Sequence, residues 1–86
     1  MKHSELKQND LVLFYIYSDI LKRNYAEIGT VIYVREDTKE VMISWLCGYR
    51  TMVDDVPFNK VIATIDDNEE YKEIDGIKGK FKLLQG

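Results

Sequence analysis

The chain has 86 residues, a formal net charge of −3 and a pI of about 5.1, and 45% of its residues are hydrophobic. This length holds one small domain, and the hydrophobic content excludes wholesale disorder. No run approaches the roughly 20 apolar residues of a membrane-spanning helix, and the first residues lack the apolar core of a secretion signal. The single cysteine excludes an internal disulfide, so we expect a cytoplasmic protein.

The first nine residues are polar and predict either one helical turn capped by Ser4 or a frayed end that carries His3, the only histidine. Residues 11–17 follow and form the most apolar strand of the sequence, LVLFYIY. Neither of its two alternating faces is polar. We therefore expect one face in the core and the other covered by the chain's own C-terminus or by another molecule.

Residues 18–27 form a long connection, and Ser18 is placed to cap a short helical turn within it. The next part of the chain, residues 28–65, is rich in β-branched and aromatic residues and predicts four short strands, at 28–34, 41–45, 51–53 and 61–65. A single 3₁₀ turn is expected at Pro57–Lys60, because Pro57 fixes its own φ angle. Short strands joined by short turns predict an antiparallel meander that rolls into a barrel.

Negative charge is concentrated late in the chain. Residues 54–75 hold eight acidic and two basic residues, a local balance of −6. The end of this segment predicts either a capped helix from Asp67 to Glu73, stopped by Gly76, or a mobile acidic tail. Residues 78–84 alternate enough to form a last strand, which we expect to pack over the second face of residues 11–17. The predicted organisation is thus a barrel over residues 1–65 and an acidic extension over residues 66–86.

Several segments occur in a familiar order: Asp10-Leu11-Val12, Gly29-Thr30-Val31, Val41 to Trp45, Gly48, and Val56 to Ile62. In spacing and residue type this arrangement resembles the SH3-like barrels, which include Tudor and KOW domains. The resemblance implies a five-stranded antiparallel barrel that binds a peptide, a protein or a nucleic acid, mostly without catalysis. It also suggests an accessory protein of a phage or plasmid, since small stand-alone barrels of this kind are frequent there. The acidic segment offers a further alternative, an inhibitor that imitates phosphates and occupies a nucleic-acid-binding protein.

The residues that carry catalysis in other proteins are sparse in this sequence. One histidine and one cysteine cannot form a structural zinc site, and no glycine-rich phosphate loop is present. Cys47 is expected to be a small apolar filler in a turn, and the paired acids to be solvated. The trimethoprim-resistant plasmid reductases share the barrel, but residues 51–54 do not match their Val-Gln-Ile-Tyr active-site strand. We therefore expect no enzyme activity, no metal and no cofactor.

Aromatic side chains support the leading functional hypothesis. Trp45, Phe14 and Phe58 are expected in the core, whereas tyrosine hydroxyls favour a wet edge and protein interfaces. The aromatic candidates line either a peptide groove or a cation cage, with Asp19 or Glu27 as the acid of the cage. Basic residues near Tyr25 provide the alternative, a small patch for single-stranded nucleic acid. The full set of predicted binding residues is Tyr15, Tyr17, Lys22, Arg23, Tyr25, Trp45, Tyr49 and Arg50.

The sequence therefore predicts a non-catalytic module that binds another protein. The contact would use the outer face of residues 11–17 and the connection 18–27, and self-association is one form it would take. The main alternative is an accessory nucleic-acid-binding barrel of the KOW or Tudor type. The acidic balance and the scattered bases disfavour that alternative, because nucleic-acid-binding domains normally present a basic face. No membrane contact is expected.

Overall fold

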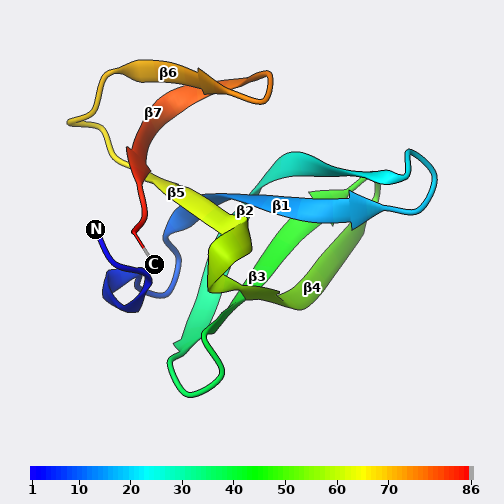
Figure 1. Ribbon diagram of the computed structural model, residues 1–86, viewed down its shortest axis with the longest axis horizontal. Helices are drawn as coiled ribbons and strands as arrows, with labels where there is room; N and C mark the ends of the chain where they lie inside the picture. The colour runs from blue at the N-terminus through cyan, green and yellow to red at the C-terminus, as the bar shows by residue number, and fades with distance from the viewer. Residues whose placement is uncertain (86) are drawn as a thin grey trace.

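The computed structural model describes residues 1–85, which form seven strands, two 3₁₀ turns and no α-helix (Figure 1). The all-β prediction is therefore confirmed, and so is the 3₁₀ turn after Pro57. Within residues 1–85 there is no helix with the length and apolar character needed to cross a membrane. In chain order the elements are η1 (His3–Glu5), β1 (Leu11–Ser18), β2 (Arg23–Arg35), β3 (Glu40–Cys47), β4 (Arg50–Pro57), η2 (Phe58–Lys60), β5 (Val61–Ile65), β6 (Tyr71–Ile74) and β7 (Ile77–Leu83).

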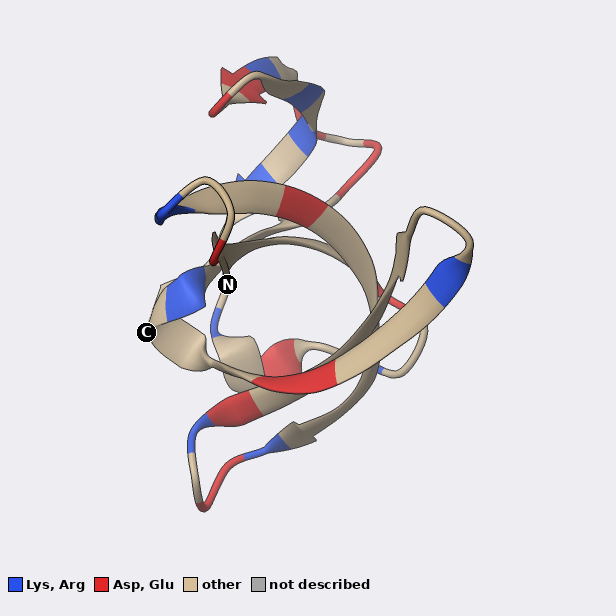
Figure 2. Ribbon diagram, turned by 90° about the vertical axis from the view of Figure 1, so that its right-hand side faces the viewer, with Lys and Arg blue, Asp and Glu red and all other residues tan. Residues whose placement is uncertain are grey.

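The seven strands form one antiparallel sheet in the order β4-β3-β2-β1-β5-β7-β6. Figure 2 shows how strongly this sheet curls, although β4 and β6 remain its two unpaired edges. The long strand β2 bends where its register with β3 shifts between Val31 and Tyr33. A bulge of this kind adds twist and lets a strand turn a corner. Because β4 and β6 do not pair with each other, the curled sheet is open.

The first core lies on the concave side of the sheet. Val12 and Phe14 of β1 are fully buried there, and Phe14 packs edge-to-face on Trp45 with 5.1 Å between the ring centres. Gly29 makes this packing possible, because a Cβ at that position would lie 2.5 Å from Ile43 Cγ2 and 2.8 Å from Phe14. The complete buried set of this core is Leu6, Val12, Phe14, Val31, Val41, Ile43, Trp45, Val56 and Val61.

A second core lies on the other face of β1. Leu13 has no exposed surface and packs with Ala63 and Phe81, which are also fully buried. Partly buried residues of β2, β5 and both hairpin strands pack against this cluster: Ala26, Ile28, Ile62, Ile65, Ile74 and Ile77. The hypothesis that Leu13 belongs to a contact surface for another molecule is therefore wrong. The chain's own C-terminal strands cover it, and only the two ends of that face, Leu11 and Tyr17, are exposed.

The predicted helix from Asp67 to Glu73 is wrong. Asp66 instead closes a turn, since its side chain accepts a hydrogen bond from the Asn68 amide at 2.9 Å, and strand β6 follows. Asp75 and Gly76 have φ angles of 49° and 83° and form a two-residue hairpin turn between β6 and β7. An Asp-Gly pair between apolar residues favours this turn, so Gly76 joins two strands and does not end a helix.

The N-terminus is ordered by its contact with the end of the chain. Lys2 forms an isolated bridge with Gln85, whose amide donates to the Met1 carbonyl at 2.8 Å. His3 is only 3% exposed. Of the two alternatives for this segment, the frayed end is not present. A short turn is present as η1, but it is a 3₁₀ turn that begins at His3, so Ser4 lies within the turn and the predicted Ser4 cap is wrong.

Candidate functional site

Two hairpin ends lie at the same end of the molecule, on the right in Figure 1. The β1–β2 connection is a tight turn in which the Lys22 amide donates to the Ser18 carbonyl at 2.8 Å and the Leu21 amide to the Ser18 hydroxyl at 3.1 Å. This turn holds Ile20 out into solvent, where it is 92% exposed. The β3–β4 connection turns at Gly48, which has a φ angle of 65°. Next to it Tyr49 is fully exposed.

Exposed apolar side chains occur at both hairpin ends and along the adjoining part of β4, at one end of the molecule but on opposite sides of the curled sheet (Figure 2). We call this set the hairpin-end surface; its members are Tyr17, Ile20, Leu21, Leu46, Tyr49, Met52 and Val53. Single exposed apolar residues are common on any protein, but a group of this size at one end is a feature of interaction sites.

A groove of about 450 Å³ runs between β4 and the β1–β2 hairpin. Strand register shows which side chains face it. Ile16 packs against the first core and pairs with Tyr25, while Trp45 pairs with Met52 and Ile43 with Asp54. Cross-strand partners share a face of a sheet, so Tyr25, Met52 and Asp54 lie on the concave side. The groove is lined by Tyr15, Ile16, Tyr17, Tyr25, Trp45, Cys47, Met52, Val53, Asp54, Asp55, Val56, Pro57 and Lys60.

The groove brings together four of the predicted aromatic residues, but they do not form a cage of four rings. Trp45 is 8% exposed and belongs to the first core, as expected. Alternation along β1 turns Tyr15 and Tyr17 toward the opposite face from Ile16, and the Tyr15 hydroxyl donates to Asp75. Tyr25 alone presents a half-buried ring to the groove. Tyr49 lies outside it.

Two acids that were expected to be solvated also border the groove, Asp54 with its side chain on the groove side of β4 and Asp55 with its side chain on the other face. Asp55 forms an ion pair with Arg35 at 3.4 Å, and one oxygen of Asp54 accepts the Asp55 amide at 2.8 Å. The acids expected for a cage, Asp19 and Glu27, do not line this groove. Partial burial raises the pKa of Tyr25, and Cys47 and Glu27 add to that rise. The Cys47 thiol is exposed beside the groove, so it is not an apolar filler.

The predicted basic residues do not form one patch. Arg23 lines a smaller recess of about 280 Å³ with Tyr25 and Asp75. Lys22 is exposed in the β1–β2 turn, and Arg50 is exposed at the start of β4. Figure 2 shows these two hairpin ends, each carrying Lys or Arg, on opposite sides of the curled sheet. A single strand of nucleic acid would therefore meet separate charges and not a continuous basic track.

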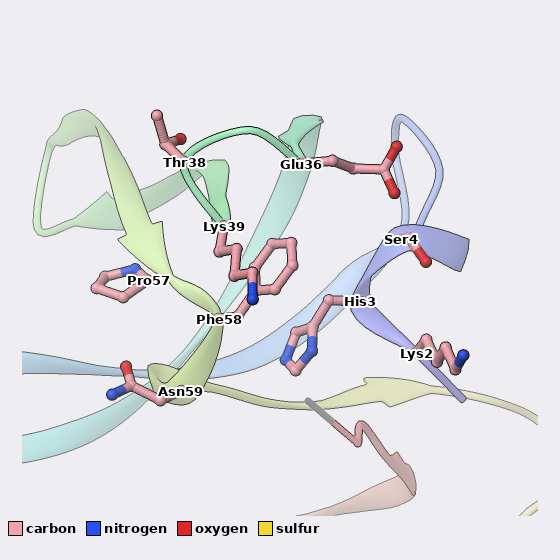
Figure 3. A pocket seen from close by; sticks show the side chains of 9 residues that line it. All are labelled: Lys2, His3, Ser4, Glu36, Thr38, Lys39, Pro57, Phe58 and Asn59. Atoms are coloured by element: carbon pink, nitrogen blue, oxygen red, sulfur yellow. The ribbon is translucent and has the colours of Figure 1, made fainter.

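A second groove, of about 620 Å³, lies at the C-terminal end of β4, between η1, η2 and the β2–β3 turn, where Figure 3 shows Lys39 and Phe58 facing His3 and Ser4. The His3 ring stacks on Phe58 with 4.6 Å between centres, and its Nε2 donates to the Val61 carbonyl at 2.8 Å. His3 Nδ1 is buried without a hydrogen-bond partner in residues 1–85. These contacts anchor the N-terminal turn. This groove is lined by Lys2, His3, Ser4, Glu36, Thr38, Lys39, Pro57, Phe58 and Asn59.

Comparison of the chain with protein-family models, with curated proteins and with solved structures finds no match. Among residues 1–85 there is also no group of three His, Cys, Asp or Glu side chains that could hold a metal ion.

Proposed function

We propose that the chain is a non-catalytic protein-binding domain of the SH3-like type, in which β1–β5 form the barrel and the hairpin-end surface contacts the partner. The order β4-β3-β2-β1-β5 and the 3₁₀ turn between β4 and β5 support the resemblance to those barrels. The covered side of β1 is no longer part of the proposed contact, because Leu13 is buried in the second core.

The observation that carries this proposal is the exposure of large apolar side chains at the hairpin ends. Ile20 and Tyr49 expose nearly all of their surface and come from two different hairpins. Burying such surface releases roughly 25 cal/mol per Å², so these residues gain most when another protein covers them. Tyrosine is also favoured at protein interfaces, because its ring packs while its hydroxyl stays hydrated.

Charge favours a protein partner over a nucleic acid. The chain carries a net charge of −3, and the Asp54 carboxylate lies in the groove beside the apolar residues. Phosphates approaching this groove would meet that carboxylate and release few counterions. Self-association remains one form of the proposed contact, in which the partner is a second copy of the chain.

Site-specific photo-crosslinking tests the proposal. A photoreactive phenylalanine is placed at Tyr49, or at Tyr71 of β6 as a matched control, and the protein is irradiated in an extract of the source cells. Both tyrosines are exposed, but only Tyr49 belongs to the hairpin-end surface. We expect discrete adducts from position 49 that disappear with Ile20→Asp and are absent from position 71. An adduct of twice the chain's mass would identify a second copy as the partner.

Two results would overturn the proposal. The first is that position 49 gives no adduct beyond those of position 71. The second is that the adducts of position 49 persist in the folded Ile20→Asp variant. A Tyr71→Asp variant controls for a general effect of surface charge and should leave the adducts unchanged.

A further inference from the structure

We infer that the free edge of β4 accepts an extended segment of the partner protein, with a basic side chain facing Asp54 and apolar side chains on either side of it. This inference deepens the proposed function, since it names the chemistry of the partner at the groove beside the hairpin-end surface. Strand addition to a sheet edge takes its affinity from main-chain hydrogen bonds and its specificity from alternate side chains.

The two edges of the sheet differ in how well they are protected. β6 has only four residues, and its middle carries Lys72 and Glu73. Short, charged edges resist pairing with another chain. β4 has eight residues, and the half-exposed Met52 and Val53 lie at its middle. The edge open to an added strand is therefore that of β4.

The backbone of β4 shows which groups a new strand would meet. The Asp55 amide donates to the neighbouring carboxylate of Asp54, so this N–H points away from β3. Because backbone groups alternate along a strand, those of Thr51 and Val53 point to the same free edge. Pro57 has no N–H and limits pairing at the far end. The docking segment is therefore Thr51 to Asp55.

Side-chain alternation sets the pattern of the added strand. Met52, Asp54 and Val56 pair with Trp45, Ile43 and Val41, so all three lie on the groove side of β4. Asp55 lies on the other face and is matched by Arg35. Asp54 has no basic partner within residues 1–85, although Lys60 lines the same groove. A strand with an apolar, a basic and an apolar residue at alternate positions would therefore complement this edge.

The same charges disfavour a second copy at this edge. In a two-fold antiparallel pairing of β4 with itself, centred on Val53, Asp54 of each copy would lie opposite Met52 of the other copy and diagonal to the other Asp54. No basic side chain would then face Asp54, and two like charges would lie on the same face of the sheet. The occupant that fits is therefore a basic, extended segment of a different protein.

Nuclear magnetic resonance titration with two synthetic peptides tests this inference. The acetylated and amidated peptide Thr-Val-Thr-Lys-Thr-Val-Thr is compared with the same peptide carrying Glu in place of Lys. We expect amide shifts confined to β4 and its groove, slower hydrogen exchange at Thr51 and Val53, and about fivefold weaker binding of the Glu peptide. Asp54→Lys should reverse the preference, Asp54→Asn should abolish it, and Glu73→Lys on β6 should leave it unchanged.

Three outcomes would overturn the inference. The first is that neither peptide shifts the β4 amides at millimolar concentration. The second is that both peptides bind equally well to the native chain. The third is that the β4 amides shift with protein concentration alone, which would indicate a second copy at this edge. None of these depends on the crosslinking at Tyr49. Loss of the peptide effect with the Tyr49 adducts intact would remove the strand-addition site and leave the proposed function standing.

Discussion

The two faces of β1 support two cores of very different size. Val12 and Phe14 point into a core of nine buried residues drawn from all of β1–β5 and the N-terminal turn. Leu13, between them, points into a core in which, within residues 1–85, the other fully buried members are Ala63 and Phe81. A strand with both faces apolar is therefore explained without a partner molecule. The difference also implies that the small core is the weaker one, because it depends on a single hairpin.

The largest expected effects come from removing one phenylalanine from each core. Phe14 and Phe81 are both fully buried. Phe14→Ala should cost about 4 kcal/mol, which is most of the stability of a small domain, so the whole chain should unfold at lower denaturant. Phe81→Ala should cost about 3 kcal/mol and release mainly the β6–β7 hairpin. Chemical denaturation and amide hydrogen exchange measure both.

Hydrogen exchange decides how separate the two cores are. If Phe81→Ala accelerates exchange in β6 and β7 while β2 and β3 stay protected, the hairpin opens on its own. Equal acceleration in every strand would show instead that both cores form one cooperative unit. The second core would then not be weaker than the first.

A second pair of variants compares how tightly the two cores are packed. Gly29→Ala would place a Cβ 2.8 Å from the Ser44 carbonyl oxygen, which belongs to a paired backbone and cannot move away. Gly79→Ala would place one 2.7 Å from the Phe81 ring, a side chain that can shift. We expect a loss of about 2 kcal/mol for Gly29→Ala and about 1 kcal/mol for Gly79→Ala in denaturant unfolding. A larger loss of stability for Gly79→Ala than for Gly29→Ala would show that the second core does not adapt more easily than the first.

Local patterns were sufficient to predict most of the strands. β5 has the predicted limits, and the predicted final strand at 78–84 is present as β7, shifted by one residue at each end. β2 begins at Arg23, five residues before the predicted Ile28, because polar residues such as Asn24 pair with β1. Strand length there is set by the partner and not by β propensity. The missed strand β6 follows the same rule, since its polar residues are held by β7.

The site was predictable only in part, because some of its residues are brought together from positions far apart in the chain. Tyr17, Tyr25 and Trp45 could be grouped because each borders a hairpin end of the expected meander. Asp54 could not be assigned to a groove, because its environment depends on β4 being an edge of the sheet and on its distance from β1. Nor could Asp75 be matched with Tyr15, 60 positions away. Such long-range pairs have no local signal in a single sequence.

The smallest expected effect concerns the hydrogen bond from Tyr15 to Asp75, which joins the β6–β7 hairpin to β1. This bond, with burial and the Asp75 charge adding to it, raises the pKa of Tyr15 above its ordinary value of 10.0. The folded form thus keeps a proton that the unfolded chain loses first. The stabilisation is complete below pH 10.0 and is lost as the pH rises through the higher folded pKa.

Tyr15→Phe should therefore lower the free energy of unfolding by about 1 kcal/mol at neutral pH and by less in alkaline solution. Denaturant unfolding of both proteins across neutral and alkaline pH measures this, with Tyr17→Phe as the matched control on the same strand. The Tyr17 hydroxyl makes no hydrogen bond within residues 1–85 and is exposed, so its removal should change little. A constant difference between Tyr15→Phe and the native chain at every pH would mean that the loss is one of packing. The bond to Asp75 would then not be what fastens the β6–β7 hairpin to β1.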